Sequence, residues 1–374
     1  MNNMNKLAIT ITFLFFAAGL TAQSTESWPI FRGNQQLTGV SKFELPDQPK
    51  LLWTFQTGDN IKSAPVVDQG KVVIGSTDGI VYCLDTNGKL LWKFETSNTI
   101  EAPALIHKNT VYIGNLDGNF YALDLTTGAK KWEYETDNQI IGSANWWETG
   151  GTTYILVGSY DYYLHCVDAQ TGEVKWKYES DNFINGAPAC SDGKTFFGGC
   201  DGFLHVVDIV SGKADKKIDV ATYVPGSPAL EKQKAYLGDY DGRFFQVDIE
   251  KEETSWEWED ENTSLPFIAS PAVLGNRLFT ANHNKFLYAF EKNSGKKVWD
   301  YNTGNRVEAS PVVAGNKVVV ANMRGDLALV NTSDGKVVWT YEIGSQIIHN
   351  PALAGGKMFV GAYDGNVYCF GGPS

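Results

Sequence analysis

The feature that most constrains this chain is a repeat of about forty residues. It is marked most clearly by tryptophan, at Trp53, Trp92, Trp132, Trp176, Trp256, Trp299 and Trp339. One member is missing from the series, and Lys216 stands in its place. A series of prolines and a series of Asp-Gly pairs follow the same spacing. Each of the three series indicates eight units.

Each unit reads as four short strands. In Ser63 to Phe94, four β-rich runs are separated by Gly, Asn and Asp residues, which is typical of an antiparallel meander. No run has a sustained helical period. One such sheet cannot bury both of its faces, but eight sheets arranged radially can. The sequence therefore predicts an all-β fold, an eight-bladed β-propeller of four-stranded antiparallel blades.

The two ends of the chain are expected to meet in one blade. The eighth unit, Asn350 to Phe370, ends after its third strand, whereas Lys50 to Phe55 matches the fourth-strand sequence Leu90 to Phe94. We therefore expect a strand at about residues 50–56 to complete the C-terminal blade. The seven tryptophans then lie on outermost strands, where we expect them to fill the seams between neighbouring blades.

The first residues have the features of a secretory leader. Lys6 precedes an apolar run from Leu7 to Leu20, and small residues follow up to Ala22. We predict a signal peptide at residues 1–23 and a single propeller domain at residues 24–374. No cysteine lies near the cleavage site, so the expected product is exported, periplasmic or secreted, without a lipid anchor and without direct membrane insertion. The net charge of -12 argues against a nucleic-acid partner.

Five cysteines in an exported chain raise the question of disulfides. Cys83, Cys166 and Cys369 share one repeat position, where other units carry residues such as alanine or valine, so they are predicted to be interior residues. A turn at 191–194 would set Cys190 opposite roughly residue 195 and leave Cys200 out of register. We expect no structural disulfide.

The repeat also resembles a known family. The unit from Gly114 to Trp132, with its Asp-Gly, Tyr-Ala-Leu-Asp and Thr-Gly steps, resembles the pyrroloquinoline-quinone-type propeller repeat, and the opening Trp28 to Gly33 is similar to the start of many exported members. One branch contains quinoprotein dehydrogenases, and another contains the non-catalytic propeller subunit of the outer-membrane β-barrel assembly machinery. The dehydrogenases share a vicinal cysteine pair that this sequence lacks.

The resemblance to the second branch implies a non-catalytic, monomeric scaffold that binds protein partners, without a cofactor. The alternative is an enzyme or sensor that holds pyrroloquinoline quinone with calcium, or another small ligand, in the central funnel. The candidate funnel residues are Lys62, Glu101, Asn185, Glu308 and His349. His165 and His205 occupy a position that is tyrosine in other units, so we predict aromatic packing for them and no catalytic or metal site.

A partner surface is expected where units depart from the consensus. The candidates are Trp146 and Trp147 in a lengthened hairpin, and Trp258, Glu259, Asp260 and Glu261 in an acidic loop. Exposed tryptophan favours an interface. The alternatives are that the two hairpin tryptophans begin a longer strand and pack inside, and that the acidic loop is a solvated surface. The two sites are predicted to lie on opposite faces of the disc.

Overall fold

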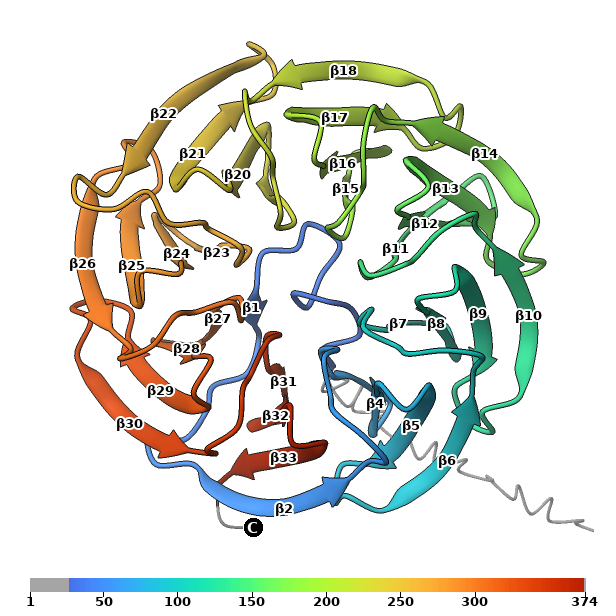
Figure 1. Cartoon of the computed structure of the whole chain (residues 1–374), viewed down its shortest axis with the longest axis horizontal. Helices are drawn as coiled ribbons and strands as arrows, with labels where there is room; N and C mark the ends of the chain where they lie inside the picture. Colours follow the sequence, from blue (N-terminus) through green and yellow to red (C-terminus); the bar gives the residue numbers. More distant parts are fainter. Residues whose placement is uncertain (1–26, 373–374) are drawn as a thin grey trace, which may run out of the picture.

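The computed structural model describes residues 27–372, which form a closed ring of eight antiparallel blades around a central channel (Figure 1). The predicted all-β, eight-bladed propeller is confirmed. Within each blade the first strand lies next to the channel and the last lies on the outer wall. The signal peptide predicted at residues 1–23 lies outside the described residues and stays a prediction.

The first four blades follow one another along the chain. Their strands are β3 (Val66–Asp68), β4 (Lys71–Gly75), β5 (Ile80–Asp85) and β6 (Leu90–Glu95) in blade 1; β7 (Leu105–His107), β8 (Thr110–Gly114), β9 (Asn119–Asp124) and β10 (Lys130–Glu135) in blade 2; β11 (Asn145–Thr149), β12 (Thr152–Gly158), β13 (Tyr163–Asp168) and β14 (Val174–Glu179) in blade 3; and β15 (Ala189–Ser191), β16 (Lys194–Gly198), β17 (Phe203–Asp208) and β18 (Ala214–Asp219) in blade 4.

The remaining blades complete the circle. Their strands are β19 (Ala229–Glu231), β20 (Lys234–Gly238), β21 (Arg243–Asp248) and β22 (Glu253–Glu259) in blade 5; β23 (Ala272–Leu274), β24 (Arg277–Ala281), β25 (Phe286–Glu291) and β26 (Lys297–Asn302) in blade 6; β27 (Val312–Ala314), β28 (Lys317–Ala321), β29 (Asp326–Asn331) and β30 (Val337–Glu342) in blade 7; and β31 (Ala352–Ala354), β32 (Lys357–Gly361), β33 (Asn366–Gly371) and the N-terminal β2 (Lys50–Gln56) in blade 8. A short further strand, β1 (Val40–Ser41), pairs in parallel with β27 inside the channel.

The N-terminal strand closes the ring as expected. β2 pairs antiparallel with β33, so blade 8 has the order β2-β33-β32-β31. Its register shifts between Leu51 and Trp53, and the third and fourth strands of blade 1 show the same shift just before Trp92. Such a bulge redirects the side chain that follows it. The closing strand thus repeats the geometry of a continuous blade, and the prediction of a strand at about residues 50–56 is confirmed.

The repeated tryptophans sit at the seams between blades. Trp92 donates a hydrogen bond from its indole Nε1 to the carbonyl of Leu125 in the next blade, at 2.9 Å. Its ring packs under Gly128, where an added Cβ would lie 2.7 Å from the indole and where φ is +74°. Only glycine suits that position, since the backbone is left-handed and the ring leaves no room. Five further tryptophans make the equivalent bond, namely Trp53, Trp132, Trp176, Trp256 and Trp299.

The seventh tryptophan of the series faces a different environment. Trp339 lies at the seam with blade 8, where the two ends of the chain meet in place of a continuous turn. Its ring packs edge-on against Phe370, with centroids 5.7 Å apart.

The seam between blades 4 and 5 uses an ion pair in place of this packing. Lys216 occupies the tryptophan position, and its Nζ lies 2.6 Å from Oε1 of Glu252. Glu252 replaces the turn glycine and keeps its left-handed backbone, with φ of +59°. Both members of the tryptophan–glycine contact are therefore exchanged together at this one seam.

We expect Trp92→Ala to destabilise the ring by about 3–5 kcal/mol, because truncating a buried indole leaves a cavity. Lys216→Ala at the equivalent seam should cost much less than Trp92→Ala, because it removes a solvent-screened ion pair and leaves no comparable cavity. Urea unfolding followed by tryptophan fluorescence measures both. Equal losses for the two variants would contradict this account of the seam.

Residues 28–41 fill the channel, which the sequence did not lead us to expect. Main-chain carbonyls of this segment accept hydrogen bonds from the innermost strands of successive blades, beginning with Val67 N–H to Trp28 in blade 1 and ending with Val313 N–H to Gly39 in blade 7. Blades 2, 4, 5 and 6 contribute the N–H groups of Ile106, Cys190, Leu230 and Val273, and blade 3 contributes the Nδ2 amide of Asn145, which donates to the carbonyl of Gln35 at 2.8 Å. We call residues 28–41 the plug.

Arg32 anchors the plug to two blades. Its side chain is fully buried, and its guanidinium donates to the carbonyl of Pro311 at 2.7 Å and to that of Pro271 at 2.8 Å. These prolines precede the innermost strands of blades 7 and 6. The side chain therefore ties the N-terminal segment to two neighbouring blades at once.

Arg32→Ala should lower the free energy of unfolding by about 2 kcal/mol or more, because two buried carbonyls lose a charged donor. Arg277→Ala is the matched control, since that guanidinium is partly exposed and its nearest carboxylate, on Glu291, is 3.9 Å away. Thermal unfolding by circular dichroism distinguishes them. An Arg32 variant as stable as the control variant would show that the plug contact contributes little.

Candidate functional site

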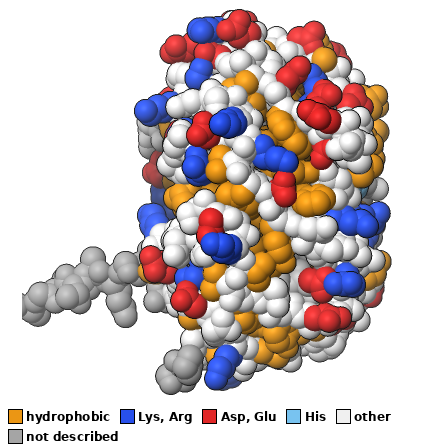
Figure 2. Space-filling view, turned by 90° about the vertical axis from the view of Figure 1, so that its left-hand side faces the viewer, with side chains coloured by type: hydrophobic (Ala, Val, Ile, Leu, Met, Phe, Trp, Pro, Cys, Tyr) orange, Lys and Arg blue, Asp and Glu red, His pale blue; other side chains and the backbone are white. Residues whose placement is uncertain are grey.

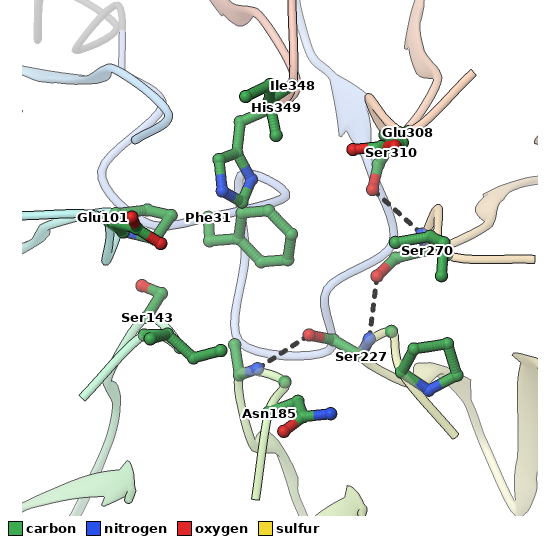
Figure 3. Close-up of a pocket in the computed structure, with 18 of the residues that line it drawn as sticks. Phe31, Glu101, Ser143, Asn185, Ser227, Ser270, Glu308, Ser310, Ile348 and His349 are labelled. Atoms are coloured by element: carbon green, nitrogen blue, oxygen red, sulfur yellow. Dashed lines mark hydrogen bonds between the residues drawn. The ribbon is translucent and has the colours of Figure 1, made fainter. Parts of the chain in front are cut away.

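The central funnel is a pocket of about 270 Å³ with the plug as its floor, and apolar as well as polar side chains line it (Figure 3). Phe31 of the plug lies beneath the imidazole of His349, with ring centroids 6.3 Å apart and planes nearly perpendicular. The walls come from the loops that lead into the innermost strands of blades 2 to 8. Four of the five predicted funnel residues line this pocket, namely Glu101, Asn185, Glu308 and His349.

The fifth predicted residue, Lys62, stands beside the pocket and pairs with its wall. Its Nζ lies 2.7 Å from Oε1 of Glu101, and this hydrogen bond raises the pKa of Lys62. On the opposite wall, His283 Nε2 lies 3.4 Å from Oε1 of Glu308, and that contact lowers the pKa of Glu308. Arg306 Nε also lies 3.6 Å from Oε1 of Glu308. Both wall carboxylates therefore have basic neighbours outside the lining, one for Glu101 and two for Glu308.

His349 is held in its neutral form between the two carboxylates. Burial lowers its pKa to about 4, and the charges of Glu101 and Glu308 oppose that shift only in part. At neutral pH the imidazole therefore contributes no charge, and the pocket lining carries only the two glutamates as charged groups.

Three serines form a hydrogen-bonded arc in the wall. The hydroxyl of Ser227 accepts from Ala187 N–H at 2.7 Å, that of Ser270 from Ser227 N–H at 2.9 Å, and that of Ser310 from Ser270 N–H at 2.9 Å. The sequence reasoning missed these residues and Phe31. The serines each stand directly before a proline of the repeat series, so the pattern that located the blades could have located them.

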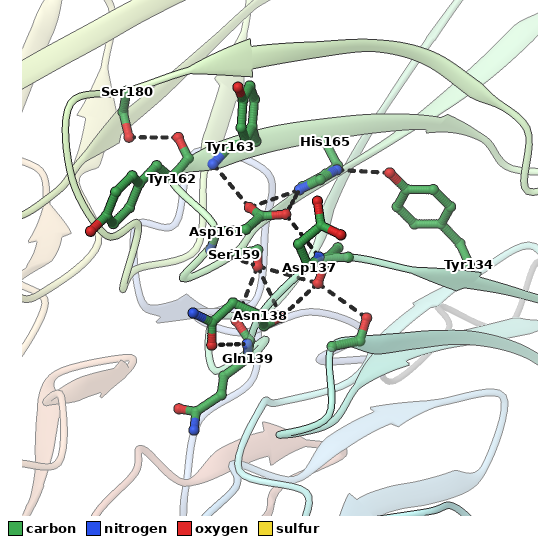
Figure 4. A network of polar contacts seen from close by, with 12 residues as sticks. Tyr134, Asp137, Asn138, Gln139, Ser159, Asp161, Tyr162, Tyr163, His165 and Ser180 are labelled. Carbon is green, nitrogen blue, oxygen red and sulfur yellow. Dashed lines mark hydrogen bonds and ion pairs between the residues drawn. The ribbon is translucent and has the colours of Figure 1, made fainter.

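Two buried histidines link neighbouring blades by hydrogen bonds, and Figure 4 shows the first of them, His165. His165 Nε2 lies 2.9 Å from Oδ2 of Asp161, and its Nδ1 lies 2.8 Å from the hydroxyl of Tyr134 in the preceding blade. His205 repeats this arrangement with Asp201 and Tyr178. The rings also pack against aromatic neighbours, with His205 stacked on Phe197 at 4.8 Å. Their role is therefore both packing, as predicted, and polar linkage between blades.

This linkage makes the ring sensitive to acid. Burial raises the pKa of Asp161, and the hydrogen bond and charge of His165 lower it, with a net pKa below the usual value; Asp201 behaves in the same way with His205. A carboxyl whose pKa is depressed by folding stabilises the native state above its unfolded pKa of about 4 and loses that contribution as pH falls through the folded value.

We expect Asp161→Asn with Asp201→Asn to lower the thermal midpoint at pH 7 and to flatten its decline below about pH 4. Asp137→Asn, at an exposed loop carboxylate, should leave both properties near those of the unaltered protein. Calorimetry between acid and neutral pH measures the midpoint. An unchanged acid decline in the double variant would contradict the assignment.

The lengthened hairpin of blade 3 contains the two predicted interface tryptophans. β11 has five residues where the other innermost strands have three, and both Trp146 and Trp147 lie within it, half-buried. Trp146 stacks on His107 of blade 2 with centroids 3.9 Å apart, and Trp147 packs against the core between blades 3 and 4. Both side chains thus begin a longer strand and pack inward in part. Whether they bind a partner stays a prediction.

The acidic loop of blade 5 begins at the outer wall. Trp258 is half-buried and its ring lies 4.9 Å from that of Tyr288 and 5.1 Å from that of Phe290, so it belongs to an aromatic cluster between blades 5 and 6. Glu259 and Glu261 are exposed, and Asp260 Oδ2 accepts a hydrogen bond from Asn284 at 3.2 Å. The structure does not bring this loop to the hairpin of Trp146.

The described residues offer little for a metal or a disulfide. Calcium needs 6–8 oxygen ligands, and within residues 27–372 no group of three or more His, Cys, Asp or Glu side chains is placed to hold an ion. The funnel carboxylates lie on opposite walls and already have basic neighbours, so this donor set does not fit calcium. All five cysteines are free, and Cys190 pairs across its hairpin with Thr195.

Solved structures resemble this ring at low sequence identity. BamB from Moraxella catarrhalis aligns with a TM-score of 0.73 at 19% identity, over 87% of this chain and 98% of that one. Quinohemoprotein alcohol dehydrogenase from Comamonas testosteroni aligns with a TM-score of 0.77 at 14% identity, over 93% of this chain and 81% of that one. At these identities the likeness concerns the fold. No curated protein matches the sequence.

In the part of the chain that the structure describes, no helix is long and apolar enough to cross a membrane.

The family comparison is more specific than the likeness of shape. Residues 40–145, 142–285 and 283–371 match the family described as outer membrane protein assembly factor BamB. These stretches span all eight blades, and the chain therefore belongs to that family.

Proposed function

We propose that this protein is an exported, non-catalytic scaffold that binds protein partners during cell-envelope or outer-membrane protein assembly. The observation that carries the proposal is the plug. Residues 28–41 occupy the channel and are hydrogen-bonded to the innermost strands around it. The space in which a propeller could enclose a cofactor is thereby reduced to a pocket of about 270 Å³, just below the usual range of about 300–1,000 Å³ for small-molecule sites.

The exterior of the ring offers a larger surface for binding a protein partner than the funnel does. On the side of the ring that Figure 2 shows, acidic and basic side chains are interspersed with apolar ones. The departures from the repeat, at Trp146 and Trp147 on one face and at Trp258 to Glu261 on the other, are the proposed partner sites. The proposed location is the periplasm or the exterior of the cell, reached by means of residues 1–23.

The second candidate is a quinone-dependent enzyme or sensor. It is favoured by the shape shared with the Comamonas testosteroni dehydrogenase and by two carboxylates in the funnel. Against it, the two carboxylates face each other across the pocket with basic neighbours, and Phe31 occupies the floor.

Chemical cross-linking in the native host, followed by purification of this protein, should capture a protein partner. Trp146→Ala with Trp147→Ala, or Glu259→Gln with Glu261→Gln, should reduce that capture, whereas Val174→Ser on the outer wall should not. Circular dichroism shows whether each variant is folded.

Titration of the purified protein with pyrroloquinoline quinone and calcium should give no saturable change in absorbance or thermal midpoint. Saturable quinone binding together with dye-linked alcohol oxidation would establish the enzyme and overturn the scaffold.

A further inference from the structure

The funnel opens at the end away from the plug, and the charged side chains of its lining are all acidic. The plug closes its floor, while the pocket reaches Tyr160, which lies in the turn between β12 and β13. The lining includes Glu101 and Glu308 but neither lysine nor arginine. Because His349 is neutral at ordinary pH, the lining itself carries no positive charge. The basic groups that pair with the two carboxylates, Lys62 at Glu101 and Arg306 at Glu308, stand outside the lining, so an incoming cation has to compete with them.

Asn185 and Ser227 line the same pocket. The Oδ1 atom of Asn185 is buried and has no hydrogen-bond partner within the described residues. A buried acceptor without a partner is costly, so a donor supplied by a ligand would be stabilising there. Figure 3 shows Asn185 and Ser227 on the wall opposite His349, with Glu101 and Glu308 on the sides between them. The charged and unpartnered groups of the lining are therefore hydrogen-bond acceptors, which suit a cation that carries several N–H donors.

Tyrosines recur at the turns on the face of the ring where Tyr160 lines the pocket. Tyr160, Tyr240 and Tyr363 occupy the same turn position in blades 3, 5 and 8, and the N–H of each donates to a carbonyl of the loop from the preceding blade, at 2.9, 3.0 and 2.8 Å. Tyr240 is 54% exposed, and Tyr223, whose carbonyl it contacts, is 52% exposed. Exposed tyrosines give contact area for a polypeptide and a π surface for a cationic stem.

We propose that the funnel binds the side chain of a lysine or arginine presented by a partner polypeptide. The charged end enters between Glu101 and Glu308, and the flanking residues of the partner lie on the tyrosines of the mouth. The overall charge of -12 favours the approach of a basic segment. This inference rests on the proposed scaffold function and identifies the chemistry of one partner contact.

Variants of Lys62 and variants of the two glutamates should change the affinity for a basic peptide in opposite directions. Its ammonium holds Glu101 at 2.7 Å and is only partly exposed, so it competes with an incoming cation for that carboxylate. Removing the glutamates should weaken binding of a basic peptide, and removing the Lys62 charge should strengthen it.

The probes are three blocked pentapeptides, Gly-Phe-X-Phe-Gly, with lysine, norleucine or glutamate at X, and free spermidine as a small cation. Calorimetry should show saturable binding of the lysine peptide and binding at least about tenfold weaker for norleucine, which has a similar length without the charge. Glu101→Gln with Glu308→Gln should weaken the lysine peptide by about tenfold or more, and Lys62→Met should tighten it.

Asp59→Asn with Asp137→Asn is the matched control, because it removes the same charge from exposed loops on the same face. Equal binding of the lysine and norleucine peptides, absence of binding, or a control effect as large as that of the glutamate variant would overturn the proposal. Spermidine binding as tight as the peptide would also overturn it by showing a pocket for free cations. If cross-linking still captures a partner while the peptide tests fail, the scaffold stands and only the funnel assignment falls.

Discussion

Closure of the ring is the constraint on which the other features depend. Seven blades are continuous in sequence, but the eighth exists only when β2 from the N-terminal region pairs with β33 near the C-terminus. Without β2, blade 8 would have three strands, and β33 would lie unpaired and open to pairing with another chain; β2 covers that edge and gives the blade its fourth strand. It also fixes the route of the N-terminal segment, which must pass from the channel to the outer wall before β2 begins.

The path of that segment follows from this requirement. After β1 pairs with β27, the chain leaves the channel beside blade 7, where the buried Lys317 donates to the carbonyl of Leu45 at 3.1 Å and pairs with Asp47 at 2.8 Å. The innermost strands present N–H groups to the channel, and buried N–H groups need acceptors. The plug supplies them. The same segment therefore satisfies the inner edges of the blades and leads to the strand that closes their circle.

Periodicity explains how much of this could be predicted from sequence. Trp92 and Gly128 have equivalents at most seams, where the same steric condition holds, so the repeated series revealed the blades, the closing strand and the position of each tryptophan. The plug has no second copy, and its contacts use main-chain carbonyls that any sequence possesses. Trp28 to Gly33 resembled other exported proteins, but nothing in its spacing showed that Arg32 reaches the carbonyls of Pro271 and Pro311. Likewise, the exchange of His for Tyr at residue 165 indicated packing, while its bond to Tyr134 depends on the rotation of one blade against the next.

The same reasoning separates structural from functional positions in the funnel. Each blade has a buried apolar residue in the loop before its innermost strand, such as Ile61, Ile100 or Val307. The residue directly after it is charged in these three cases, as Lys62, Glu101 and Glu308. The fold requires the buried residue, because it fills the interior beside the channel, and places no comparable demand on the next one, which points to the mouth of the pocket. Packing does not impose the difference in charge among these equivalent positions, and the proposed cation contact uses it. The proposal therefore rests on side chains that the repeat leaves free to vary.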